Sequence, residues 1–151
     1  MNVQAISHIA IGVTDMERAL DFYRDVIGLR VRADQVEELP QMGGEEPHKR
    51  RAVYLCYGEG PHESFVVLDQ MLSVDPYGEP ARLFQTGVHH FAFWVDDLDE
   101  VVERIRGAGM DVTFGPMDAA TETYGEPPGG IVRTAIVNDP DGNLVQFDQR
   151  S

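Results

Sequence analysis

The chain has 151 residues, 42% of them hydrophobic, which suffices for one compact domain or two small halves that share a core. It carries 26 acidic against 12 basic residues, a formal net charge of −14, so we expect neither nucleic acid nor a membrane surface as a partner. No run approaches roughly 18 apolar residues, and no basic start leads into an apolar segment, so neither a membrane span nor a secretion signal is expected. The single cysteine, Cys56, cannot form an internal disulfide, and a cytoplasmic protein is expected.

Two blocks of the sequence recur. Residues 6–15 align with residues 88–97 at an offset of 82, with His8 on His90, and residues 64–70 align with residues 143–149 at an offset of 79. The matched blocks open and close each half, which indicates a duplicated unit. We therefore expect a first module at 1–75, a linker at 76–87 that contains Pro76, Gly78 and Pro80, and a second module at 88–151.

The elements of the first half follow a β-α-β-β-β order. The alternating block at 6–15 predicts a strand, and apolar residues at helical spacing predict a helix over about 15–27, capped by Thr14 or Asp15 and ended by Gly28. Strand-like runs follow at 29–32, 52–57 and 64–69.

The second half repeats this order. A strand at 88–95 leads into a helix whose apolar stripe begins at Leu98, capped by Asp96 or Asp97 and stopped by Gly107 or Gly109. Strands are predicted at 110–114, 131–137 and 144–148, with a turn at 138–143 between the last two. We expect an α+β fold in which two tandem βαβββ modules form a curved mixed sheet around a cleft, with polar loops at 36–50 and 115–130 beside the site.

A metal site is predicted from the strand faces. Alternation puts His8 and His90 on the sheet face away from their helices, and the repeat relates the two histidines. On the last strand Gln146 shares the corresponding face with Asp148, and its counterpart in the first half is Val67. Two imidazoles and one amide oxygen suit Fe(II), Mn(II), Zn(II), Ni(II) or Co(II), and three protein ligands leave positions open for substrate.

Three segments carry a resemblance to a known family. The runs SHIAIGVTDMERALDFYRDVIGL, VHHFAFWVDDLDEV and NDPDGNLVQFD are similar to the vicinal oxygen chelate superfamily, also called glyoxalase/bleomycin resistance/dioxygenase proteins. The resemblance implies metal ligands at His8, at the Val67 position, at His90 and at Gln146. With the Val67 position vacant, the pattern looks most like the extradiol ring-cleaving dioxygenases, which implies Fe(II), a small oxygenated or aromatic substrate and dioxygen.

The chain departs from that pattern at several positions. The dioxygenases carry a glutamate where Gln146 stands, a tyrosine where Ile136 stands, and a histidine that this chain lacks between Met110 and Ile136. Acid–base candidates would then come from loops: His48, His62 or Tyr124. The basic run at 49–51 is a weaker candidate, for an anionic substrate group.

Two other functions remain open. The first is a glyoxalase- or epimerase-type lyase or isomerase, although those enzymes fill four ligand positions and use a carboxylate as proton-transfer base. The second is a metal-free protein that binds an antibiotic, which the His8 and His90 pair opposes and which Val67 and Gln146 favour. The resemblance also allows a homodimer, because members of the family often dimerise.

Overall fold

The computed structural model describes residues 2–39, 47–60 and 63–151 and divides into two compact units, Met1–Gly78 and Glu79–Ser151. The division falls inside the segment 76–87, and each unit is described by itself below. Among the described residues, no helix is both long and apolar enough to cross a membrane.

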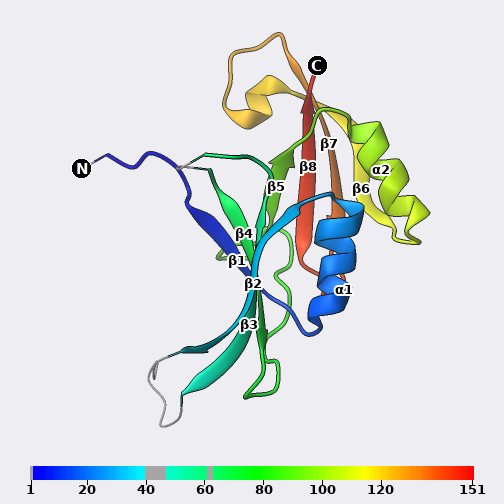
Figure 1. Cartoon of the computed structure of the whole chain (residues 1–151). Coiled ribbons are helices and arrows are strands. Elements are labelled where there is room, and N and C mark those ends of the chain that lie inside the picture. The colour runs from blue at the N-terminus through cyan, green and yellow to red at the C-terminus, as the bar shows by residue number, and fades with distance from the viewer. Residues whose placement is uncertain (1, 40–46, 61–62) are drawn as a thin grey trace. The chain divides into compact units, whose positions relative to one another are not determined.

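The first unit has one helix and one four-stranded sheet (Figure 1). The sheet order is β1-β4-β3-β2, with β1 parallel to β4 and the other pairs antiparallel. Helix α1 continues without a break into the π-helical turn η1. The elements are β1 (His8–Gly12), α1 (Met16–Leu20), η1 (Asp21–Val26), β2 (Arg30–Leu39), β3 (His48–Cys56) and β4 (Phe65–Met71).

The second unit repeats this topology. Its sheet order is β5-β8-β7-β6, again with one parallel pair, β5 with β8. Helix α2 packs against β6, β7 and β8, as Figure 1 shows. The elements are β5 (Phe91–Trp94), α2 (Leu98–Gly107), β6 (Val112–Ala120), the 3-10 turn η2 (Thr121–Tyr124), β7 (Ile131–Asn138) and β8 (Leu144–Arg150). The predicted βαβββ order is confirmed in both halves.

The helix boundaries follow from local chemistry. Asp15 caps α1 by accepting hydrogen bonds from the backbone N–H groups of Glu17 and Arg18, and Asp97 caps α2 through Glu100. Gly28, at φ 94°, supplies the left-handed residue that ends the first helical segment. The sequence offered Thr14 or Asp15 as the first N-cap and Asp96 or Asp97 as the second. The second residue of each pair, Asp15 and Asp97, is the cap.

One face of each sheet forms a core with its helix. Strand alternation directs Val66 and Leu68 of β4 to the same side as Met16 and Leu20 of α1. The second unit does the same with side chains that are at most 3% exposed: Leu98, Val102, Ile105, Val145 and Phe147. Removal of this apolar area from water is the main stabilising term of each unit.

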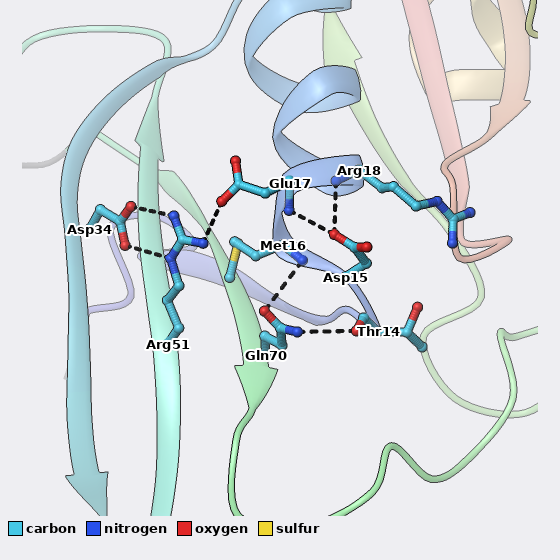
Figure 2. Close-up of polar contacts among 8 residues, drawn as sticks. All are labelled: Thr14, Asp15, Met16, Glu17, Arg18, Asp34, Arg51 and Gln70. Carbon is cyan, nitrogen blue, oxygen red and sulfur yellow. Dashed lines mark hydrogen bonds and ion pairs between the residues drawn. The ribbon is translucent and has the colours of Figure 1, made fainter.

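Hydrogen bonds and ion pairs connect α1 to its sheet (Figure 2). The Gln70 amide accepts a hydrogen bond from Met16 N at 3.3 Å and donates one to Thr14 O at 3.2 Å. Arg51 on β3 forms a bidentate pair with Asp34 and also reaches Glu17 at the start of the helix. Gln70 thus satisfies one backbone N–H, that of Met16, which the first helical turn leaves unpaired.

The two predicted loops are shorter than expected. Strand β2 continues through Leu39 and β3 begins at His48, while residues 40–46 lie outside the described chain. Opposite charges face each other across this pair, Glu37 with Arg50 and Glu38 with Lys49, so both ends of a polar stretch that resembles a loop in sequence are paired strands.

The second predicted loop is also shorter than expected, and only residues 125–130 are irregular. Strand β6 continues from Val112 to Ala120 through register shifts around Gly115 and Pro116, a dipeptide that in sequence indicates a loop. Beyond it the chain forms η2 rather than an open loop.

Candidate functional site

In the first unit, the sheet face away from α1 presents His8. This histidine lies opposite Phe65 in the β1–β4 register, and the two rings stack with centroids 5.2 Å apart. Ala10 lies opposite Val67, whose side chain is 4% exposed. The Val67 position therefore offers an aliphatic surface and no metal-binding atom.

Charged groups occupy the same face further along the strands. Arg50 contacts Glu37 at 2.8 Å and Asp69 at 2.9 Å, the latter as an ion pair without hydrogen-bond alignment. Tyr54 donates its hydroxyl hydrogen to Glu37. Burial raises the pKa of Asp69, against the opposing effect of Arg50, whereas the hydrogen bond from Arg50 lowers the pKa of Glu37. The charge of Arg50 is thus matched inside the unit, and so is that of Arg51.

In the second unit, three polar side chains meet on the corresponding face. Gln146 Nε2 donates to both carboxylate oxygens of Asp148, at 2.9 and 3.1 Å, and lies 3.4 Å from the Tyr124 hydroxyl. Tyr124 donates its hydroxyl hydrogen to Asp148 Oδ1 at 2.9 Å. Because a carboxylate accepts only, the amide nitrogen must face it, which leaves the lone pairs of Gln146 Oε1 to act as a metal ligand.

This cluster, Tyr124–Asp148–Gln146, combines burial with charge. Asp148 is 3% exposed, and its hydrogen-bond donors here are neutral groups. Burial, followed by the hydrogen bond to Asp148, raises the pKa of Tyr124. Tyr124 therefore stays protonated at neutral pH and keeps donating to the carboxylate.

The segment that carries Tyr124 is fastened to the sheet. Thr121 donates its hydroxyl hydrogen to Pro127 O at 2.7 Å, and Arg150 forms a bidentate pair with Glu126 at 2.6 and 2.7 Å. The Arg150 guanidinium also lies 4.3 Å from the Trp94 ring centroid. These contacts position Tyr124 over β8.

His90 lies directly before β5, beside His89. Their Nδ1 atoms are 2.8 Å apart, so one ring donates and the other accepts. Burial, followed by the neighbouring His89, lowers the pKa of His90, against a smaller opposing effect of Asp148. The imidazole is therefore neutral at pH 7, which is the form that binds a metal.

The sequence candidates fall into separate places. Tyr124 and Gln146 are brought together, whereas His48 lies opposite Leu39 at the far end of β3 from Cys56, the residue paired with Phe65. The nine residues of β3 span about 26 Å, so His48 lies far from His8 along the sheet. His62 falls outside the described residues. Within the described ranges, no three histidine, cysteine, aspartate or glutamate side chains are grouped as a metal site.

A family comparison matches nearly the whole chain. The family described as the Glyoxalase/Bleomycin resistance protein/Dioxygenase superfamily matches residues 5–147. The chain belongs to this superfamily. Lactoylglutathione lyase of Haemophilus influenzae is 30% identical over 142 residues, which cover 94% of this chain and 90% of that protein.

Two solved structures share the fold of this chain. A glyoxalase family protein from Bacillus cereus aligns with a TM-score of 0.78 at 17% identity, over 99% of this chain and 96% of that one. An antibiotic binding protein from a Streptomyces species aligns with a TM-score of 0.61 at 26% identity, over 100% and 99% of the two chains. The two-module fold expected from the repeat is thereby confirmed.

The comparisons do not support the expected extradiol dioxygenase. The relative at 30% identity is named as a lyase, which agrees better with the alternative reading of the sequence. The preference for Fe(II) depended on the dioxygenase resemblance and is likewise unsupported.

The predicted ligand set fits a divalent ion of the Zn(II), Ni(II) or Co(II) kind. Imidazole nitrogens from His8 and His90 and the amide Oε1 of Gln146 are ligand atoms that such ions accept. Val67 supplies nothing, so the set holds no carboxylate. The assignment of these three ligands stays a prediction.

Two residues, Asp148 and Arg32, were not among the site residues predicted from the sequence. Asp148 follows Gln146 by two positions, and the period of a strand already places it on the same face. Arg32 lies at a shift in the β2–β3 register, between Val31 and Ala33, which no local sequence pattern indicates.

Proposed function

We propose that this protein is a glyoxalase-type lyase or isomerase that moves a proton within a small oxygenated molecule without net oxidation. The observation that carries the proposal is the 30% identity, over nearly the full length of both chains, to a lactoylglutathione lyase. That name directs attention to hemithioacetals of glutathione as the first substrate class to test.

Asp148 is the group we assign to proton transfer. Enzymes of this type need a carboxylate base, and the ligand positions of this chain, Val67 and Gln146, provide none. Asp148 is a buried carboxylate hydrogen-bonded to Gln146 Nε2 and to the Tyr124 hydroxyl. In the proposed reaction it removes a proton from the hydroxyl-bearing carbon next to the substrate carbonyl and returns it to the carbonyl carbon. The hydroxyl proton passes to the former carbonyl oxygen, so the product is a hydroxy thioester with no net oxidation.

The neighbours of Asp148 have distinct tasks. Tyr124 holds one carboxylate oxygen and, because its pKa is raised, remains a donor throughout the reaction. Gln146 fixes the orientation of the carboxylate through Nε2 and keeps Oε1 for the metal. A divalent ion held by His8, His90 and Gln146 would polarise a substrate oxygen.

The first test is a paired activity measurement on the full-length protein. After reconstitution with Zn(II), Ni(II) or Co(II), we expect thioester formation from methylglyoxal and glutathione and no oxygen uptake with catechols. Metal content by mass spectrometry should be about one ion per chain, lost in the His8→Ala/His90→Ala double variant. Oxygen consumption with catechols, or metal-loaded protein that isomerises neither hemithioacetals nor acyl-CoA thioesters, would contradict the proposal.

A second function is favoured by one observation. The apolar Val67 and the neutral Gln146 weaken any metal site, and the Streptomyces protein at 26% identity is described as antibiotic binding. A protein that takes up no metal under any of these conditions, yet binds an aromatic antibiotic with wild-type affinity in the double histidine variant, would support this binding function.

A further inference from the structure

Arg32 occupies an irregular position on β2. The register runs Arg30 with Cys56 and Val31 with Leu55, and then resumes at Ala33 with Tyr54, so Arg32 is the unmatched residue of a β-bulge. Bulges redirect a side chain away from the face that strand alternation would give it. The redirected side chain here is a guanidinium on a long, flexible stem.

The Arg32 side chain ends at the Phe65 ring, on the sheet face that points away from α1, which is called the open face. Its guanidinium carbon lies 4.4 Å from the centroid of the Phe65 ring, on β4, although β3 runs between β2 and β4. His8 stacks on the same ring at 5.2 Å. Side chains from β2 and β1 therefore both contact the Phe65 ring on β4.

The guanidinium of Arg32 is not neutralised by the described part of the chain. Seven other arginines lie within 4.0 Å of a carboxylate, namely Arg24, Arg30, Arg50, Arg51, Arg104, Arg133 and Arg150. Arg32 forms no such pair among the described residues, in a chain whose net charge is −14. A guanidinium stacked on a ring keeps its N–H edge for a bidentate acceptor.

We propose that Arg32, stacked on the Phe65 ring, binds the carboxylate of a small molecule. The N–H fork of Arg32 matches the two oxygens of a carboxylate, and the contact with the Phe65 ring holds the guanidinium in place without using its N–H groups. The inference rests on the proposed function only where it equates the bound molecule with the substrate, because the binding itself requires no turnover.

The test uses benzoate as the probe, benzamide as its neutral isostere and inorganic phosphate as a second anion. Binding to the full-length protein is followed by NMR shifts of backbone amides and of the arginine Nε–H groups. We expect benzoate to saturate the Arg32 signal, to bind at least about tenfold more tightly than benzamide, and to weaken as salt is added.

Substitutions then assign the site. Arg32→Gln should weaken benzoate at least about tenfold, and Arg32→Lys should recover part of the loss, because it restores the charge without the fork. Arg30→Gln is the matched control, since Arg30 is on the same strand and already pairs with Glu59. Circular dichroism confirms that each variant is folded.

Several outcomes would overturn the proposal. They are equal binding of benzoate and benzamide, an equal loss in Arg30→Gln, tighter binding of phosphate than of benzoate, or no saturable benzoate binding. Benzoate binding with the predicted arginine dependence, in a protein that proves inactive as a lyase, would retain the carboxylate site and reject only the proposed function.

Discussion

The two units keep equivalent contacts between each helix and its sheet, and carry different side chains on the sheet face away from the helix. Gln149 accepts from Leu98 N and donates to Asp96 O, as Gln70 does at the equivalent positions of the first unit. Arg133 pairs with Asp99 and lies 3.6 Å from Asp118, which repeats the arrangement of Arg51 in Figure 2.

The open faces have diverged at the same offsets. Val67 stands against Gln146, and Gly12 against Trp94. Asp69 has an arginine partner, whereas its counterpart Asp148 is held by neutral donors. The helix-facing side thus carries what both copies need in order to fold, and the open side is where the copies have become different.

The largest effect on stability is expected in the shared core. Met16→Ala and Leu98→Ala remove repeat-related side chains that are 0% exposed, and each should lower the free energy of unfolding by about 2–5 kcal/mol. Hydrogen exchange of the amides in each unit measures the two losses separately. If one substitution left its own unit as protected as before, the equivalence of the two cores would be wrong.

A smaller loss of stability is expected where Gln70 and Gln149 accept a hydrogen bond from the first turn of each helix. Gln70→Leu and Gln149→Leu each leave a helix N-terminal N–H without its partner, and the loss should be about 1–3 kcal/mol. The hydrogen bonds of Gln149 are the shorter ones, at 3.1 and 2.9 Å, so its substitution should be the more harmful. Denaturant unfolding of both variants gives the order, and the reverse order would contradict this comparison.

The arginine pairs should contribute less to stability than the glutamine hydrogen bonds, because they are exposed or partly exposed and screened by salt. Arg51→Gln and Arg133→Gln test this by thermal unfolding at low and high salt. A loss that is the same at both salt concentrations would indicate packing rather than charge.

The same pairs predict a pH effect with a definite sign. Hydrogen bonds from Arg51 and Arg133 lower the pKa values of Asp34 and Asp99. Because the folded pKa lies below the unfolded one, this stabilisation is present above the ordinary aspartate range and is lost as the pH falls through the lowered pKa. Carboxyl NMR should show the Asp34 pKa rising in Arg51→Gln, with Asp99 unchanged as the internal control.

The sequence predicts the helix-facing side better than the open side. Caps, apolar stripes and the module order depend on neighbours within a few positions, and the repeat shows each of them twice. The extension of β2 depends on cross-strand pairs such as Glu37 with Arg50, which a polar stretch does not reveal by itself. The contact of Tyr124 with Asp148 spans 24 positions, and the bulge at Arg32 depends on register, so neither follows from local pattern.

The most direct test of the account compares Asp148→Asn with Asp69→Asn. These residues are equivalent by the repeat, and asparagine keeps the size of the side chain while removing the base. We predict that Asp148→Asn lowers kcat/KM for the hemithioacetal by about 100-fold or more with metal content unchanged, whereas Asp69→Asn changes it by less than about tenfold. Equal losses, or activity that survives in Asp148→Asn, would contradict the assignment of proton transfer to the second unit.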